Sequence, residues 1–431
     1  MSELSTAEKV QDAERAALKL ASTSDEERTM ALEAIASTIE ESHEAILSAN
    51  AADVDAAEVQ LAAGEYSQAL VDRLTLSATK IDGIVEMVRS VAAQEDLLGK
   101  TTQATKLDDG LTLQKRTVPI GVVGTVFESR PDALVQIAAL CLKSGNSVIL
   151  KGGSEAAETN RLLYELIVSA TGSMPEGWVQ QIEARADVDT LLSMDDSIDL
   201  LMPRGSTEFV SYMQDNTSIP VLGHADGICH VYVDAEADLT MAADIAFDAK
   251  VQYPAVCNAV ETLLVHESVA ETFLPEIASQ YNEAGVEMRG DARSRAIIPM
   301  EEASDADWVT EYGDLIISIA IVDSLSEAID HITTYGSKHT DASVTENPDH
   351  ARQFRAGLDS ASVFHNASTR FADGYRFGLG AEVGISTGKV HARGPVGIEG
   401  LTTYQYYLEG DGHLVATYAG ADAKPFKHET L

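Results

Sequence analysis

The chain has 431 residues, of which 45% are hydrophobic, and its 69 acidic and 30 basic side chains give a formal net charge of −39. This length and hydrophobic content suit a globular protein of two or three domains. So negative a surface repels nucleic acid and anionic lipid, which excludes both as expected partners. The chain starts without the apolar core of a secretory signal, and no apolar run is long enough to span a membrane, so we expect a cytoplasmic location.

The acidic residues are spread along the whole chain, as at 25–27, 195–196 and 301–302. This distribution indicates a negatively charged folded surface and not a disordered acidic tail. Dense acidic surfaces with few lysines keep proteins hydrated at high salt. We therefore expect a halophilic protein, with an ordinary acidic protein of a mesophile as the alternative.

The first hundred residues are expected to be helical, because apolar residues recur at intervals of three and four. Helices are predicted over 14–21, 27–39 and 80–91, with candidate caps for the second helix at 22–25. A polar stretch over 101–110 then precedes a strand predicted over 111–115.

From residue 121 onward, short apolar strands alternate with helices. This alternation predicts an α/β fold of parallel sheets covered by helices on both faces, most simply divided into two α/β domains. The strands are predicted over 121–127, 147–150, 179–182, 200–202 and 231–233, and the helices over 131–142, 155–169, 207–213, 270–281, 325–331 and 348–355.

Cys257 follows a proline break and precedes the strand-like residues 261–265. A thiol at a turn, among polar neighbours, can be ionised and reached by a substrate, and only the thiolate is a useful nucleophile. The alternative is a small buried hydrophobe, which is what we predict for Cys141 at the end of an apolar helix. Cys229 and His230 are adjacent on a strand and point to opposite faces, and no second pair has zinc-site spacing, so we predict no metal site.

A lysine and two glycines after one of the strands form a candidate nucleotide site. Lys151 ends the strand at 147–150, and Gly152, Gly153 and Ser154 lead into the next helix. Ligands bind at the carboxyl ends of parallel strands, and glycines allow a ribose or phosphate to approach closely. The G-x-G-x-x-G fingerprint is absent, so a tight connection without a ligand is the alternative.

Basic residues are scarce enough that those beside turns are informative. Arg130, Arg204 and Arg393 each adjoin a turn. A guanidinium can bind a carboxylate or phosphate through two parallel hydrogen bonds. In so acidic a chain, the alternative for each of them is an ion pair with a neighbouring carboxylate.

Several segments form a set: VPIGVVG at 118–124, ESRP at 128–131, ALCLKSGN at 139–146, VILKGG at 148–153, PRG at 203–205, CNAVETLLV at 257–265, NASTRF at 366–371, FGLGAEV at 377–383 and HARGP at 391–395. The helical N-terminus adds ILSAN at 46–50 and DRL at 72–74. Together they resemble the gamma-glutamyl phosphate reductases of the aldehyde dehydrogenase superfamily. The resemblance covers nearly the whole chain, and its later motifs are specific to that one family.

The resemblance implies that NADPH reduces L-glutamate 5-phosphate to L-glutamate 5-semialdehyde and phosphate, on the route to proline. Cys257 would be the nucleophile that forms a thioester and releases phosphate. The backbone N–H of Cys257, with Asn258 nearby, would stabilise the oxyanion. Arg130, Arg204 and Arg393 would bind the phosphate and carboxylates of the substrate.

The resemblance also implies a cofactor site. Lys151 and Glu311 match residues that contact ribose in the superfamily, with Gly152 and Ser154 beside the lysine. Glu155, if it reached the adenine ribose, would repel a 2′-phosphate and favour NADH, whereas the family favours NADPH.

Aldehyde dehydrogenases that hydrolyse their thioester use a glutamate base in a segment resembling E-L-G-G. The corresponding residues here, 221–224, hold no glutamate, although His224 could replace it. Without a base to activate water, the thioester survives for another acceptor. A hydrolytic aldehyde dehydrogenase, a cysteine acyl transferase without a cofactor and a non-catalytic binding protein are the alternatives.

For the architecture, the resemblance implies a cofactor-binding domain over 1–103 and 117–228 and a catalytic domain over 229–397. Oligomerisation strands are expected over 104–116 and 398–415. Within these, residues 111–115 and 401–407 would form a strand pair that joins subunits edge to edge. We therefore expect a homo-oligomer, either a dimer or a tetramer.

Overall fold

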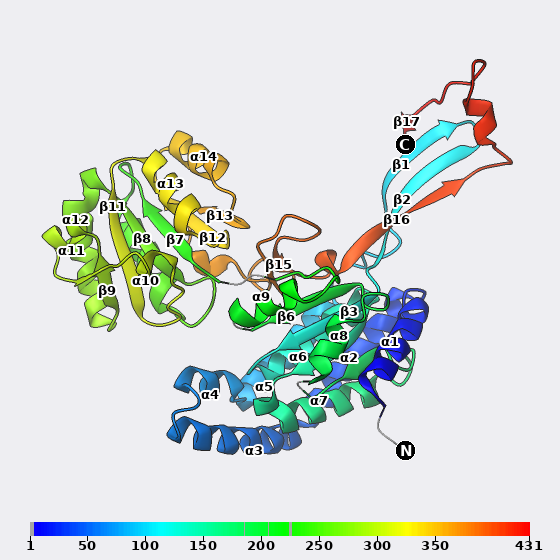
Figure 1. Ribbon diagram of the computed structural model, residues 1–431, viewed down its shortest axis with the longest axis horizontal. Helices are drawn as coiled ribbons and strands as arrows, with labels where there is room; N and C mark the ends of the chain where they lie inside the picture. The colour runs from blue at the N-terminus through cyan, green and yellow to red at the C-terminus, as the bar shows by residue number, and fades with distance from the viewer. Residues whose placement is uncertain (1–3, 185, 206, 224–225) are drawn as a thin grey trace.

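The computed structural model describes residues 4–184, 186–205, 207–223 and 226–431. The described chain forms two α/β lobes and an arm that projects from them (Figure 1). None of the described helices combines the length and the apolar character that crossing a membrane requires.

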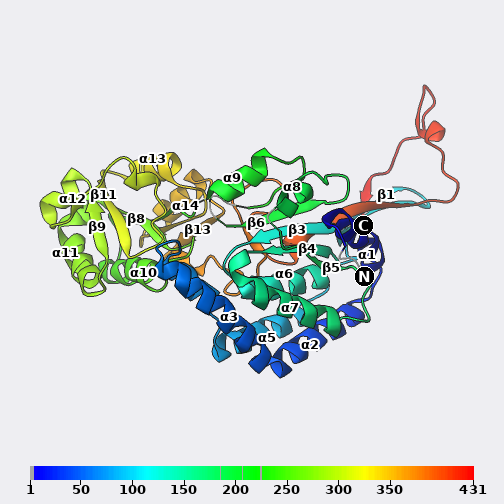
Figure 2. The ribbon, with the colours of Figure 1, turned by 60° about the horizontal axis from the view of Figure 1, so that its bottom comes forward.

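The first lobe is built on a parallel sheet. Alternation along a strand places Val122 and Val126 on one face and Val123 and Phe127 on the other, and all four side chains are buried. The sheet is therefore covered by helices on both faces (Figure 2). In sheet order its strands are β5 (Val179–Gln181), β4 (Ser147–Gly152), β3 (Val122–Phe127) and β6 (Leu200–Arg204).

The helices of this lobe divide between two apolar cores. The core on one face of the sheet contains α1 (Thr6–Leu20), α8 (Ala186–Leu192) and α9 (Thr207–Asp215). The other contains α2 (Asp25–Glu41), α5 (Ala78–Ala92), α6 (Pro131–Lys143) and α7 (Ala157–Ala170). Beside α7 lie α3 (His43–Ala62) and the 3-10 turn η1 (Ser154–Ala156), and α4 (Gln68–Leu74) packs against α3.

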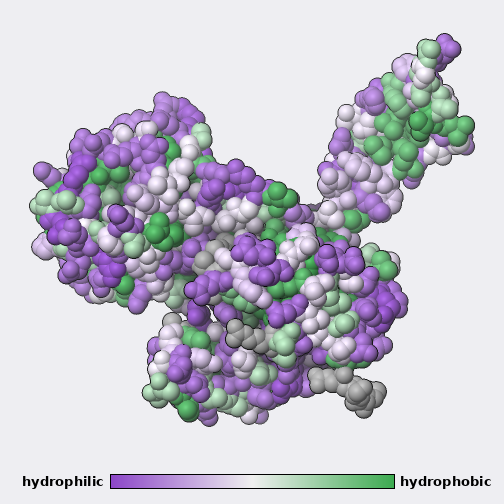
Figure 3. All heavy atoms as spheres, in the orientation of Figure 1, coloured by the Kyte–Doolittle hydropathy of each residue, from purple (hydrophilic) through white to green (hydrophobic). Residues whose placement is uncertain are grey.

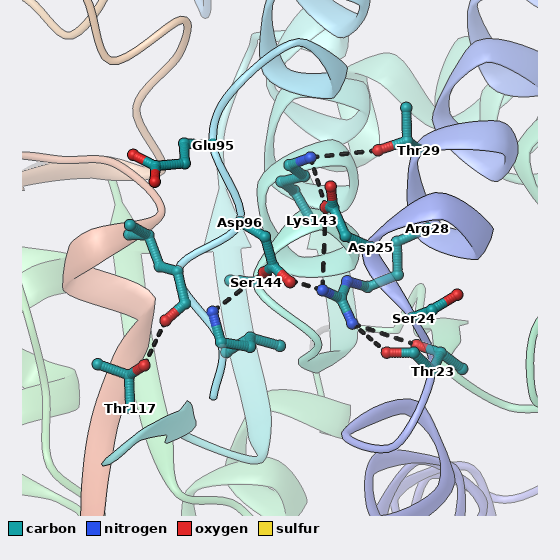
Figure 4. A network of polar contacts seen from close by, with 12 residues as sticks. Thr23, Ser24, Asp25, Arg28, Thr29, Glu95, Asp96, Thr117, Lys143 and Ser144 are labelled. Carbon is teal, nitrogen blue, oxygen red and sulfur yellow. Dashed lines mark hydrogen bonds and ion pairs between the residues drawn. The ribbon is translucent and has the colours of Figure 1, made fainter. Parts of the chain in front are cut away.

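Two buried cations fasten the N-terminal helices to the rest of the lobe (Figure 4). Lys143, at the end of α6, donates to Asp25 Oδ1 at 2.7 Å and to the carbonyl oxygen of Ala92 at 3.0 Å. Arg28 of α2 pairs with Asp96 at 2.9 Å. Because an unpartnered buried charge is strongly destabilising, these contacts fix α2 and α5 against α6.

The second lobe contains a parallel sheet of seven strands. Its core on one face is formed with α10 (Leu239–Val251), α11 (Glu267–Glu283) and α12 (Ala292–Ile297), and on the other with α13 (Leu325–Tyr335) and α14 (Pro348–Gly357). The short turns η2 (Asp307–Val309) and η3 (Thr369–Phe371) complete the lobe. In sheet order the strands are β10 (Glu301–Glu302), β9 (Glu287–Gly290), β11 (Ile316–Val322), β8 (Val260–His266), β7 (Cys229–Val233), β12 (Thr340–Val344) and β13 (Ser362–His365).

After the second lobe the chain returns to the first. The antiparallel pair β14 (Gly384–Ser386) and β15 (Gly394–Val396) is followed by the turn η4 (Glu399–Leu401). Ala381, Val383 and Val396 are buried in the core of the first lobe. This segment of the chain therefore packs against the first lobe.

The arm is a single antiparallel sheet. The expected pairing of residues 111–115 with 401–407 is present, because Gln114 pairs with Tyr407 and Lys115 with Tyr406. Its strands, in sheet order, are β16 (Thr402–Glu409), β2 (Leu111–Pro119), β1 (Thr101–Asp108) and β17 (Glu429–Thr430), with the turn η5 (Val415–Tyr418) in the C-terminal segment.

Residues 101–110, noted above as a polar stretch and expected to contain strand from residue 104, mostly form strand β1. The chain reverses between β1 and β2 at Asp109 and Gly110, where Gly110 has a φ of +76°. An Asp-Gly pair is a common two-residue hairpin turn, because glycine adopts positive φ without strain. The sequence signal was therefore present, and the polar composition obscured it.

Candidate active site

Cys257 lies in the loop between α10 and β8, and its side chain is partly exposed. Residues just before and at the start of β7 contact the backbone of this loop. A Cβ atom at Gly227 would overlap the Cα and carbonyl group of Cys257, and Cys229 Sγ donates to the Cys257 carbonyl oxygen at 3.2 Å. Contacts on the backbone of Cys257 thus fix its position and leave the thiol open to a cleft.

This cleft has a volume of about 650 Å³ and is lined by both lobes. Phe127 and Arg204, at the carboxyl ends of β3 and β6, line it from the first lobe. Glu311 and Arg370 line it from the second lobe, together with Cys257. Ligands bind at this end of parallel strands in open α/β sheets, so the thiol lies where a bound molecule is expected.

Four guanidinium groups line the cleft, and none has an ion pair with a carboxylate among the described residues. Arg204 donates to Gln136 Oε1 at 3.2 Å, and Arg370 donates to Gln252 Oε1 at 2.9 Å. The side chains of Arg73 and Arg130 make no hydrogen bond or ion pair with any residue in the described part of the chain.

Burial lowers the pKa of Arg204, of Arg73 and of Arg370, and repulsion from Arg130 lowers the pKa of the first two further. Elsewhere in the described ranges, the arginines without a carboxylate partner are Arg116 and Arg355. In a chain with a net charge of −39, unpaired cations gathered in a cleft indicate an anion-binding site.

Arg393 is not brought into this group. Its Nη1 lies 3.1 Å from Asp359 Oδ1, and its Nη2 donates to the Asp359 carbonyl oxygen at 2.6 Å. The expected alternative, an ion pair with a carboxylate, therefore describes Arg393, whereas Arg130 and Arg204 lie in the cleft without one.

Asn258 is buried beside Cys257, and its side chain makes a hydrogen bond that connects two segments of the chain. Its Nδ2 donates to the carbonyl oxygen of Ala372 at 2.8 Å, which ties the cysteine loop to the segment after η3. Its Oδ1 is buried without a hydrogen-bond partner among the described residues. The donation of an oxyanion hydrogen bond by Asn258 stays a prediction.

Two of the expected cofactor residues present unused polar groups. Lys151 is buried at the carboxyl end of β4, and its Nζ donates to the Gly152 carbonyl oxygen at 2.9 Å and makes no ion pair with a described carboxylate. Glu311 Oε2 accepts from the Gly227 backbone N–H at 2.8 Å, and its other oxygen has no hydrogen bond within the described ranges. An ammonium with spare donors and a carboxylate with a spare acceptor fit ribose hydroxyl groups.

Gly152 and Ser154, which follow Lys151, differ in how closely they are packed. A Cβ atom at Gly152 would overlap the Asn160 side chain, so close packing of β4 against α7 requires glycine there. Ser154 is exposed at the start of η1. The sequence of this turn therefore serves packing at Gly152 and leaves Ser154 accessible.

Glu155 turns back toward the loop that follows β3. Its Oε1 accepts from the backbone N–H of Ser129 at 2.6 Å and from the Ser129 hydroxyl at 2.9 Å. Ser129 has a left-handed φ of 49° and directly precedes Arg130. Glu155 thereby fixes the loop that carries Arg130. His224, considered as a substitute base, lies outside the described residues.

A buried ion pair beneath the site was missed by sequence reasoning. Lys250 Nζ lies 2.7 Å from Glu261 Oε2, and both side chains are almost fully buried. The pair contacts the loop that carries Glu311, because Lys250 also donates to the Asp314 carbonyl oxygen at 3.1 Å. Burial raises the pKa of Glu261 to about 7, against the opposing effect of Lys250.

Arg73 and Arg370 were also missed as site residues. Both lie in segments that carry the family resemblance, DRL and NASTRF, and both are basic residues in a chain poor in them. That scarcity was the available signal. Their convergence on Cys257 depends on tertiary contacts between segments that are far apart in sequence.

Comparison with known proteins places this site in a family context. The model of the aldehyde dehydrogenase family matches residues 2–319. The chain is 70% identical to the gamma-glutamyl phosphate reductase of Natronomonas pharaonis, over 98% of this chain and 97% of the relative, and 67% identical to that of Haloquadratum walsbyi, over 98% and 94%. Both organisms are halophiles, in agreement with the acidic composition.

Among solved structures, the chain is similar to the gamma-glutamyl phosphate reductase of Thermotoga maritima. The two share 39% sequence identity, and the TM-score is 0.90 over 95% of this chain and 99% of the other. A glyceraldehyde-3-phosphate dehydrogenase from Methanocaldococcus jannaschii, in complex with NADP, shares the fold at 16% identity, with a TM-score of 0.69 over 95% and 96%.

Proposed function

The chain belongs to the aldehyde dehydrogenase family and, within it, to the gamma-glutamyl phosphate reductases, and from this premise we propose that it reduces L-glutamate 5-phosphate to L-glutamate 5-semialdehyde and phosphate with NADPH. The observation that carries the proposal is an accessible cysteine, Cys257, in a cleft with four arginines that have no carboxylate partner among the described residues. Cationic groups suit a phosphorylated substrate that also carries a carboxylate. The reaction is a step toward proline, and we expect it in the cytoplasm.

In the first half of the reaction, the Cys257 thiolate attacks the acyl carbon of the substrate. The bond from this carbon to the phosphate oxygen breaks, phosphate leaves with the electron pair, and a thioester remains on the sulfur. Arg204 and Arg370 line the same cleft as Cys257, and burial lowers the pKa of both. These two guanidinium groups are therefore suited to stabilise the thiolate and the departing phosphate.

The cofactor would be held by Lys151 and Glu311, with Gly152 and Ser154 beside the lysine. When bound, NADPH supplies the hydride for reduction of the thioester carbon. Cys257 is then released as a thiolate when the aldehyde leaves, which restores the starting state. The family supports NADPH over NADH, and Glu155 is held toward the loop after β3 by two hydrogen bonds from Ser129.

We also propose that the arm joins copies of the chain in a homo-oligomer. Almost all of β16 is exposed, and the sheet of the arm is a single layer. A sheet that buries little apolar surface is only marginally stable alone. Contact with a second copy would supply that burial.

Phosphate-dependent reduction of NADP⁺ by glutamate 5-semialdehyde, measured in molar KCl, tests the reaction. The wild type should require phosphate, and Cys257→Ala should lower kcat by at least about 10⁴-fold, as loss of a catalytic nucleophile does. Cys141→Ala, which removes a thiol from the core, should retain turnover.

Three other outcomes of this assay would support the alternative functions. Turnover without phosphate would indicate a hydrolytic dehydrogenase. Acyl transfer without a change in nicotinamide absorbance would indicate a cysteine acyl transferase, and a folded but inactive wild type would indicate a binding protein.

A further inference from the structure

We propose that a side cavity of the Cys257 cleft, lined by Arg73, Arg130 and Asp132 and called the annex below, recognises the α-amino acid end of the substrate. The α-carboxylate would bind Arg73 and Arg130, and the α-ammonium would bind Asp132. The inference rests on the proposed function and deepens it. It assigns Arg73 and Asp132 as residues that determine specificity for the amino acid.

The annex is a cavity of about 300 Å³ between α4, α5, α6 and the loop at Tyr253. Arg73, Arg130 and Tyr253 line both the annex and the larger cleft that contains Cys257. The two spaces are therefore adjacent, and a molecule whose reacting carbon lies at the sulfur can extend into the annex.

The charges of the annex match an amino acid zwitterion. The side chains of Arg73 and Arg130 have no hydrogen bond or ion pair within the described residues, and Nε of Arg73 is buried without a partner there. Asp132, in the first turn of α6, likewise has no ion pair or side-chain hydrogen bond in the described ranges. The buried Nε of Arg73 is costly to leave unpaired, and the half-buried guanidinium of Arg130 and carboxylate of Asp132 line the same annex. Together these groups indicate a ligand with both signs of charge.

The apolar part of the annex suits the carbon chain of a glutamyl group. Leu76, Ile84 and Met87 line it beside the charged residues. These side chains can contact the methylene groups between the reacting carbon and the α-carbon, as in other small-molecule sites that combine apolar walls with a few polar groups.

The four arginines thus divide into two pairs. Arg204 and Arg370 line the Cys257 cleft and are not among the residues that line the annex, which places the phosphate end of the substrate with them. Arg73 and Arg130 line both the cleft and the annex. Arg73 and Arg130 are therefore the pair available for the α-carboxylate.

The test compares three aldehydes in the phosphate-dependent oxidation with NADP⁺, at one fixed KCl concentration. L-Glutamate 5-semialdehyde carries both charged groups, 5-oxopentanoate lacks the ammonium, and butanal lacks both. Arg73→Gln should lower kcat/KM for the first two by about 10- to 100-fold and leave butanal unchanged, since hydrogen bonds to charged groups contribute on this scale. Asp132→Asn should lower kcat/KM for glutamate 5-semialdehyde alone.

Arg355→Gln is the matched control, because this arginine also lacks a carboxylate partner and lies in α14, where it donates to the Ala351 carbonyl oxygen. It should leave all three substrates unchanged. Equal losses on all three aldehydes in Arg73→Gln would assign Arg73 a structural role, and no loss on any of them would remove the annex from substrate binding. Either result overturns the inference and leaves phosphate-dependent turnover by the wild type intact.

A binding measurement tests the annex even if the proposed reaction fails. Calorimetric titration of the full-length Cys257→Ala variant with L-glutamate and with glutarate should show tighter binding of L-glutamate. Arg73→Gln in that background should weaken both ligands, and Asp132→Asn should remove the difference between them. If the Cys257→Ala variant, with no other substitution, bound L-glutamate and glutarate with equal affinity, the inference would be overturned.

Discussion

Gly227 has no room for a side chain, because the backbone of Cys257 occupies the position where a Cβ atom would lie. The same residue donates its N–H to Glu311 at 2.8 Å. One glycine therefore sets the distance between the candidate nucleophile and a candidate cofactor residue. Any larger residue must displace the cysteine loop or break the contact with Glu311.

Gly227→Ala should lower kcat by about 100-fold while the protein remains folded, since a displacement of the reacting groups by about 1 Å costs this much. Steady-state kinetics with a thermal unfolding control would measure it. Gly172→Ala is the matched substitution, because nothing lies within 4 Å of a Cβ atom there, and it should leave kcat unchanged. Wild-type kcat in Gly227→Ala would show that the close approach is not required.

At this scale the sequence predicted that Cys257 lies accessible in a turn, but it did not predict which residues surround the thiol. The turn after a proline is a local pattern, so it could be read from neighbouring residues. The contact with Gly227 and the convergence of Arg73 and Arg370 join segments far apart in the chain, and no local pattern reports them. Arg393 shows the converse, because a basic residue beside a turn proved to be paired with Asp359.

Among the elements, those with a clear period were predictable. The helix expected over 27–39 is α2, which begins after Ser24 with a capping box formed by Ser24 and Glu27. Strand β1 was expected only from residue 104 and only through the family resemblance, because its side chains are polar and it is stabilised by pairing with β2. Helix α10 was also not predicted, since buried alanines on several sides weaken its apolar period.

The arm concentrates exposed apolar side chains. Figure 3 shows a mainly hydrophilic body and a hydrophobic area on the arm. Leu408, Leu414, Val415 and Phe426 are all exposed in this part of the chain. Contiguous apolar surface on a projecting element indicates a contact with another protein, and identical copies are the partner proposed above.

The variant with Leu408→Glu and Val415→Glu should therefore have the mass of one chain, 46.0 kDa, when measured by light scattering. Charges at a buried contact between copies would be costly to desolvate. Leu18→Glu, at an exposed leucine of α1, should keep the mass of the wild type. An unchanged mass in the double variant would contradict the role of the arm in assembly.

At the scale of the whole molecule, the net charge determines how stability depends on salt. A net charge of −39 destabilises the compact state through repulsion, and salt at about 1 M shortens the screening length to about 3 Å. The midpoint of thermal unfolding should therefore rise steeply with KCl concentration. Full stability in dilute buffer, in a calorimetric series against KCl, would contradict the halophilic character.

The unpaired arginines give salt a second and opposite effect. Chloride is an anion small enough to enter the cleft, and at molar concentration it must compete with the substrate for Arg73, Arg130, Arg204 and Arg370. The KM for glutamate 5-semialdehyde should therefore be higher in KCl than in potassium gluconate of equal ionic strength, whose larger anion fits the cleft poorly. The salt that we expect to keep the outside of this protein hydrated should therefore act inside its cleft as a competitive inhibitor, so that activity is highest at an intermediate KCl concentration.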